Sequence, residues 1–127
     1  MNLYKINISS AGNGWTENIS ADGTVTEDGG KIVIRYDLDG DECILTVHNG
    51  TAVQERLGVQ RVKITFSEGE KTECSIGYGG FSGAYGIFTH SLEFVSGKGG
   101  CRLSLEYTNG SSEEHVKLTF TAVKKGN

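Results

Sequence analysis

The chain has 127 residues, of which 36% are hydrophobic and 22% are charged, and its net charge is −4 at pH 7. These values predict one globular domain over residues 1–127 and exclude a disordered chain. Lysine and arginine are not clustered, so we expect no nucleic-acid partner, and no segment approaches the ~20 consecutive apolar residues of a membrane helix, so we expect no membrane partner.

Strict alternation of apolar and polar residues recurs along the whole chain, which predicts strands, and no window keeps a helical period. In chain order, the predicted strands cover residues 4–8, 15–25, 32–38, 43–47, 52–57, 62–66, 74–78, 84–95, 101–107 and 116–122. Asp39-Gly40 and Asn49-Gly50 predict two-residue hairpin turns, because both central residues of that turn need positive φ.

About ten short strands joined by hairpins predict an all-β fold, a single antiparallel up-and-down β-barrel of about 8–10 strands rather than a sandwich. The chain contains 19 glycines and no proline, and glycine is densest at positions 77, 79, 80, 83 and 86. Glycine inside a strand pattern marks a bulge or a sharp bend. We therefore expect the sheet to curl at this glycine-rich stretch, which would also line the barrel interior.

Three cysteines are present without any CxxC spacing, and the segment MNLYKINISS has no basic region followed by an apolar core. We therefore expect no signal peptide, a bacterial-type cytoplasmic location and free thiols instead of disulfides. The alternation places all three thiols on the inward face, and they are Cys43, Cys74 and Cys101.

With these segments in view, the chain resembles the YwiB-like bacterial family of unknown function, small cytoplasmic proteins assigned to the calycin, or lipocalin-like, barrels. The family's threonine–aromatic–glycine segment usually contains a proline, which this chain lacks. The resemblance implies a calycin-like barrel and no particular activity. It is carried by Gly23, Arg35-Tyr36-Asp37, Arg56-Leu57-Gly58, Phe66, residues 78–83, Thr89-His90-Ser91-Leu92 and Gly99-Gly100 leading into Leu103, Leu105 and Tyr107.

No pattern in the sequence predicts a metal site or a cofactor. The aspartates at 37, 39 and 41 flank a hairpin turn and lack the spacing of a helical calcium loop. The three histidines lie on separate predicted strands without the paired spacing of zinc ligands. Some calycin-type barrels bind haem through a histidine, and His90 is the residue that would serve. A surface role for His90 is the ordinary alternative.

Two classes of function fit the predicted barrel. The first is a non-enzymatic barrel that binds a small, partly apolar ligand in its interior, with Arg56 or His90 as the polar contact. The aromatic walls of that cavity would be Trp15, Tyr36, Tyr78, Tyr85 and Phe88. Arg56 points inward only if its strand follows the parity of Ala52 and Gln54, and the parity of Val53 and Leu57 favours the outer face. Both orientations stay open at this point.

The alternative is a barrel filled by its own side chains that acts as a protein-interaction module or homodimer, through a face or an exposed strand edge. A hydrolase or isomerase ranks last, and it would need Glu17 and Glu55 to share the lumen as an acid–base pair.

Overall fold

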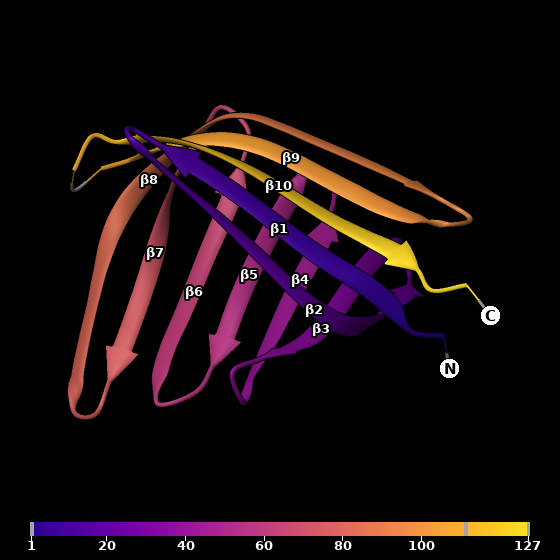
Figure 1. The fold of residues 1–127 in the computed structure, drawn as a ribbon. Coiled ribbons are helices and arrows are strands. Elements are labelled where there is room, and N and C mark those ends of the chain that lie inside the picture. Colours follow the sequence, from indigo (N-terminus) through magenta and orange to yellow (C-terminus); the bar gives the residue numbers. More distant parts are fainter. Residues whose placement is uncertain (1, 111, 127) are drawn as a thin grey trace.

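A computed structural model of the chain describes residues 2–110 and 112–126, which form ten strands and no helix. The strands are β1 (Tyr4–Gly12), β2 (Trp15–Asp28), β3 (Lys31–Leu38), β4 (Asp41–His48), β5 (Thr51–Leu57), β6 (Gln60–Ser67), β7 (Lys71–Tyr78), β8 (Phe81–Gly97), β9 (Gly100–Asn109) and β10 (His115–Lys124). Each strand pairs antiparallel with the next one along the chain, and β1 pairs with β10 to close the barrel (Figure 1). The predicted all-β up-and-down barrel is confirmed.

Two of the hairpin turns have the geometry that their sequence predicts. Asp39 and Gly40 have φ values of 52° and 87°, and Asn49 and Gly50 have values of 50° and 75°. Positive φ at both central residues gives a turn whose twist matches that of the flanking strands. These turns fix the register of β3 on β4 and of β4 on β5, and with it the face to which each side chain points.

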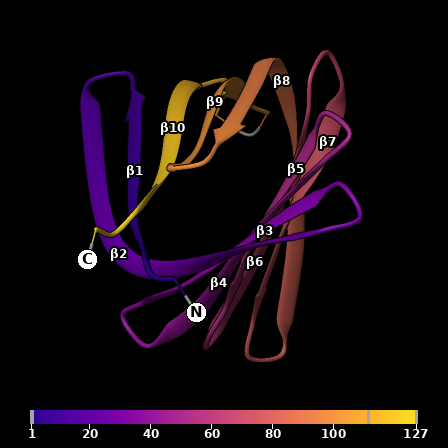
Figure 2. The same cartoon turned by 90° about the vertical axis from the view of Figure 1, so that its right-hand side faces the viewer.

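The barrel is flattened into two layers because β2 and β8 each run through both of them (Figure 2). Residues 15–23 of β2 pair with β1, whereas residues 23–28 pair with β3. In the same way, residues 81–88 of β8 pair with β7, and residues 87–97 pair with β9. One layer therefore holds β1, β10 and β9 with half of β2 and half of β8, and the other holds β3 to β7 with the remaining halves.

A different feature allows the sheet to bend at each of these two corners. At Gly23 on β2, the carbonyl oxygen of Arg35 and the Cβ of Tyr36 occupy the space that a side chain would need. On β8, a bulge between Thr89 and Ser91 shifts the register against β9. The bend predicted within residues 77–86 was therefore misplaced along β8. That stretch instead forms the β7–β8 hairpin, which turns at residues 79–80.

The core lies between the layers and consists of the inward row of each strand. Its largest fully buried side chains include Ile6, Ile34, Leu45, Leu103 and the thiol-bearing Cys43 and Cys74. All three cysteines are free; Cys101 is half-buried. Within the described residues, no helix is long and apolar enough to cross a membrane.

Candidate ligand cavity in the barrel interior

A cavity of about 220 Å³ lies between the two layers of the barrel. The layer that holds β1, β2, β9 and β10 contributes aliphatic and aromatic side chains. The facing layer, through β3 to β6, contributes both apolar and polar side chains. Its lining consists of Ile8, Ile19, Tyr36, Leu38, Cys43, Leu45, Gln54, Arg56, Val62, Ile64, Phe66, Leu103, Leu105, Tyr107, Leu118 and Phe120. Most of this lining is apolar, with a few polar groups on neighbouring strands.

Two aromatic pairs hold the shape of the cavity wall. The rings of Tyr36 and Phe120 lie 5.7 Å apart across the two layers and are tilted by 58°. The rings of Phe66 and Tyr107 lie 5.2 Å apart and are tilted by 55°. Tilted pairs at these separations are favourable beyond the area that they bury. Each pair therefore supports both of its rings in the cavity wall.

A buried polar group is centred on Tyr36. The side-chain amide of Gln54 donates a hydrogen bond to the Tyr36 hydroxyl over 2.8 Å, and Cys43 is the residue paired with Tyr36 on β4. Burial raises the pKa of Tyr36 far above its usual value of 10.0, because the phenolate would lose its hydration. Burial also raises the pKa of the Cys43 thiol. Both groups are therefore neutral near pH 7 and act as hydrogen-bonding groups rather than as charges.

Arg56 is the charged group of the cavity. It shares the inward row of Ala52 and Gln54, so the inward orientation is the one that the structure has. Its Nε donates to Oδ2 of Asp41 over 2.7 Å, and this ion pair raises the pKa of Arg56. The Arg56 side chain is 38% exposed and that of Asp41 is 27% exposed. The pair therefore lies where the cavity meets solvent.

The strands β2 and β3 separate beside the cavity. The two strands are paired from Asp28↔Lys31 to Gly23↔Tyr36, and they diverge beyond Gly23↔Tyr36. Ile19 on β2 and Leu38 on β3 line the cavity on either side of this divergence.

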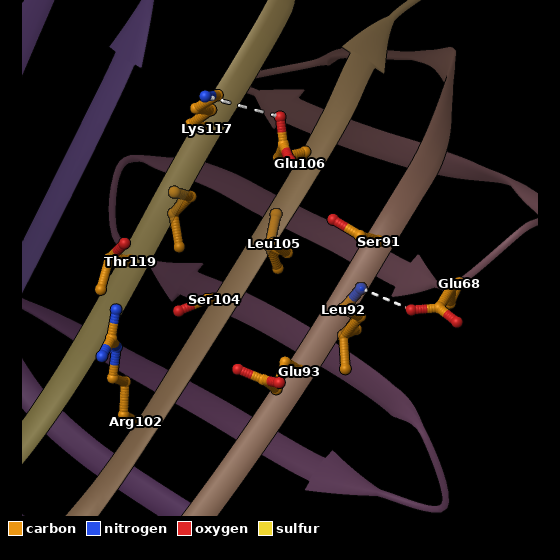
Figure 3. Close-up of a pocket in the computed structure, with 11 residues that line it drawn as sticks. Glu68, Ser91, Leu92, Glu93, Arg102, Ser104, Leu105, Glu106, Lys117 and Thr119 are labelled. Atoms are coloured by element: carbon orange, nitrogen blue, oxygen red, sulfur yellow. Dashed lines mark hydrogen bonds and ion pairs between the residues drawn. The ribbon is translucent and has the colours of Figure 1, made fainter.

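A larger hollow, of about 510 Å³, lies on the outer surface of β8, β9 and β10 (Figure 3). Charged side chains surround it, among them Glu93, Arg102 and Lys117. Lys117 lies 4.0 Å from Glu106, and the side chain of Lys117 is 72% exposed. Water competes for every contact that a ligand would make on such a surface, whereas the residues that line the interior cavity are buried or half-buried. The interior cavity is therefore the better candidate site.

Of the seven residues predicted to contact a ligand, Tyr36 and Arg56 line the cavity and the other five lie elsewhere. Trp15 is 39% exposed beyond the end of the cavity, where its indole N–H donates to Glu114. Tyr78 is 58% exposed beside the β7–β8 turn. Tyr85 is half-buried, and burial raises its pKa to about 12, but it packs beside Cys74 outside the cavity lining.

Phe88 and His90 do not point into the barrel. His90 is exposed at the β8 bulge, where its ring lies 4.9 Å from that of Phe88 and 5.1 Å from that of His115. Its Nε2 lies 2.6 Å from the Thr108 hydroxyl. Because of the bulge and their outward position, Phe88 and His90 are not part of the predicted cavity wall. His90 faces no interior space in which it could hold haem.

The sequence reasoning also missed several residues that the cavity does contain. Gln54 and Tyr107 supply polar atoms, and Phe66 and Phe120 supply aromatic rings. Each shares the parity of inward residues on its own strand, such as Ala52 for Gln54 and Leu105 for Tyr107. This shared parity was the sequence signal that could have identified them as cavity residues.

The structure keeps the other predicted chemical groups apart. Glu55 lies on the outer face, paired with Ile44 and Lys63, and Glu17 is exposed on β2. The two carboxylates therefore do not share the lumen. Among the described residues, no group of three histidine, cysteine, aspartate or glutamate side chains is placed to hold a metal ion.

Comparison with known proteins places this barrel in a family. The fold is similar to that of the ywiB protein from Bacillus subtilis, whose crystal structure matches with a TM-score of 0.88 at 15% sequence identity, covering 98% of this chain and 93% of that chain. No curated protein matches the chain. A family model described as a domain of unknown function, DUF1934, matches residues 4–119, as the resemblance to the YwiB-like family predicted. The chain therefore belongs to the DUF1934 family.

Proposed function

We propose that this barrel binds a small, partly apolar ligand in its interior cavity and does not catalyse a reaction. The observation that carries the proposal is the combination of an apolar wall with one row of polar side chains at the cavity opening. Concave, mainly apolar sites with a few placed polar groups are typical of ligand-binding sites. A core that served stability alone would not need an arginine and a glutamine in its inward rows.

The cavity limits the size of the ligand. Its volume of about 220 Å³ lies below the ~300–1,000 Å³ of sites that hold drug-sized molecules. The ligand is therefore a small molecule whose apolar part contacts Ile64, Leu105 and Phe120, and whose polar end lies near the opening.

Arg56 determines the chemistry of that polar end. Asp41 occupies its Nε, and within the described part of the chain the structure gives its two terminal nitrogens no hydrogen-bond partner. A guanidinium carries only donors, so the ligand must present an acceptor such as a carbonyl or carboxylate oxygen. Cys43 lies between Arg56 and Tyr36 in the sheet, so Tyr36 supplies a neutral hydroxyl near Arg56 as a second contact for the ligand.

Two further features fit this role. Glu17 and Glu55 do not form a carboxylate pair in the lumen, since Glu55 lies on the outer face, and this favours binding over acid–base catalysis. The three free thiols fit a reducing compartment, and we place the protein in a bacterial-type cytoplasm.

Native mass spectrometry of protein purified gently from a bacterial cytoplasm tests the proposal. We expect an additional mass that is lost on denaturation, and the value of that mass will begin to identify the ligand. An Arg56→Leu variant should lose the additional mass. The matched control is Arg35→Leu, because Arg35 lies on the outer face and pairs with Glu42 over 3.7 Å.

The proposal fails if gently purified wild-type protein carries no additional mass. It also fails in part if Arg35→Leu and Arg56→Leu lower the ligand occupancy equally, because the polar contact would then not be Arg56.

A further inference from the structure

Among the described residues, β2 has a long stretch of strand edge that no other strand covers. Residues 15–22 of β2 pair with β1 on one side. On the other side β3 begins to pair only at Gly23, and the described residues provide no other strand there (Figure 2). This open edge, residues 15–22, has side chains that are exposed apart from the half-buried Ile19 and Ala21.

The register shows which backbone groups of the open edge point away from β1. The β1–β2 turn is two residues long and closes on the pair Gly12↔Trp15, which is a hydrogen-bonded pair in a turn of this length. Hydrogen-bonded pairs alternate with non-bonded ones in antiparallel sheets. The N–H and C=O groups that point away from β1 are therefore those of Thr16, Asn18, Ser20 and Asp22.

The same rule predicts observed contacts on β8. The β8–β9 hairpin closes on Gly97↔Gly100, so the backbone of Leu92 must point away from β9. Its N–H indeed donates to a carboxylate oxygen of Glu68 over 2.8 Å, as Figure 3 shows. On the other half of β8, the backbone of Gly86 points away from β7, and its C=O accepts from Gly110 N–H over 2.8 Å.

These contacts also show that the edges of β8 are partly capped, whereas within residues 2–110 and 112–126 no such backbone contact caps residues 15–22 of β2. The β6–β7 turn bonds to Thr89 on both its N–H and its C=O, through Glu70 and Gly69. The contacts of this turn, of Glu68 and of Gly110 leave only short stretches of the β8 edges without a capping hydrogen bond. Open edges in monomeric proteins are usually protected by charged side chains, proline or a bulge. Residues 15–22 contain two charged side chains, Glu17 and Asp22, but no lysine, proline or bulge.

We propose that the open edge of β2 pairs with the same edge of a second copy of this chain, antiparallel and across a two-fold axis at Ile19. In this register Thr16 faces Asp22 of the other copy and Asn18 faces its Ser20. All four outward backbone positions of each copy then form hydrogen-bonded pairs, which gives about eight backbone bonds. An isologous contact of this kind closes at two copies and continues one layer of each barrel into the other.

The side chains of the edge are compatible with this pairing. Glu17 faces Ala21 of the other copy, so no two like charges lie opposite each other. The Thr16 hydroxyl can donate to the Asp22 carboxylate, which already accepts from Lys125 over 2.7 Å in its own copy. At the axis the two Ile19 side chains contact each other on the inward face, which adds apolar burial at the centre.

Two measurements on the full chain test the dimer. Native mass spectrometry across a dilution series should show a species of about 27 kDa, twice the 13.6 kDa chain mass, that dissociates on dilution. Hydrogen exchange of the wild type should show concentration-dependent protection of the amides of Thr16, Asn18, Ser20 and Asp22. The intervening amides, which bond to β1, should show protection that does not depend on concentration.

Asn18→Pro tests the edge directly, because it removes an outward N–H without removing a bond to β1. We expect this variant to be monomeric at concentrations at which the wild type is dimeric. The matched control is Ser96→Pro, which removes an outward N–H from an uncapped position on the β8 edge, and it should leave the dimer intact. Circular dichroism checks that both variants keep their sheet content.

A wild-type protein that is monomeric at every concentration overturns the proposal. A dimer that withstands Asn18→Pro, or whose concentration-dependent protection lies outside residues 15–22, also overturns it. Neither result affects the ligand proposal, which depends on the interior cavity and on Arg56.

Discussion

Replacing Gly23 with alanine tests whether the corner on β2 sets the shape of the barrel. A Cβ at this position would lie well inside van der Waals contact with the carbonyl oxygen of Arg35. It would also lie 3.0 Å from the Cβ of Tyr36 and 3.2 Å from Cγ1 of Ile6. Two of these neighbours belong to β3 and the third to β1, so the new methyl group must push the two layers apart where β2 crosses between them.

The cost follows from the nature of these neighbours. Forcing one extra carbon into a packed core costs typically ~1–3 kcal/mol, and here the closest atom belongs to a hydrogen-bonded backbone that cannot turn away. We expect Gly23→Ala to lower the free energy of unfolding by about 2 kcal/mol. The matched control is Gly83→Ala on β8, where a Cβ would meet no atom within 4 Å. That variant should gain about 0.5 kcal/mol, since alanine restricts the unfolded chain.

Urea unfolding monitored by circular dichroism measures both effects. With a slope of about 2 kcal/mol per molar urea, the midpoint should fall by about 1 M for Gly23→Ala and rise by about 0.3 M for Gly83→Ala. Equal midpoints for the two variants would refute the reasoning. So would a larger loss for Gly83→Ala, because the corner would then not be the constrained position.

Two further predictions concern titratable groups. A thiol reagent should label the folded protein slowly and the unfolded protein fast, because burial limits access to the thiols and raises the pKa of Cys43 and Cys101. Rapid labelling of two or more thiols in the folded state would contradict their inward placement. The hydrogen bond from His115, over 3.0 Å, lowers the pKa of Glu106 below its ordinary 4.5. This bond therefore stabilises the fold above pH 4.5 and is lost as the pH falls through the lower folded value. In His115→Gln, NMR titration should show the pKa of Glu106 moving back up, and an unchanged value would rule out His115 as the cause.

The sequence predicted the face of most side chains because alternation and two-residue turns are local. Asp39-Gly40 and Asn49-Gly50 need positive φ, and the structure has it at all four positions. Each turn transmits the parity of one strand to the next. The barrel class could therefore be predicted with no knowledge of long-range contacts.

Alternation predicts the face to which a side chain points, but it does not predict whether that position along the strand lies within the cavity or past its end. Trp15 and Tyr78 share the parity of the inward residues Ile19 and Ile76, yet both lie past the end of the cavity. Their position depends on where the two layers stop facing each other, which the two corners decide. Because the β8 bulge at Thr89 and Ser91 was not predicted, the outward position of His90 was not predicted either.

Arg56 shows a third limit of local patterns. Both rows of β5 contain apolar residues, with Ala52 on one and Val53 on the other, so composition alone left its orientation open. The register of β4 resolves it, since Arg56 pairs with the buried Cys43 and Val53 pairs with Thr46. The sequence of β4 already contained this information, but only the pairing connects the two strands.

The closure of β1 against β10 has a consequence for how the molecule folds. Ile8 and Phe120 are neighbours in the sheet although they lie roughly 110 residues apart along the chain. During synthesis, the hairpins from β2 to β9 can form in turn, while β1 keeps one edge without its partner until β10 emerges. Bringing such distant segments together carries the largest loop-closure entropy in the fold, so this step should limit the folding rate. Until it occurs, β1 is the strand most exposed to wrong pairing with another chain.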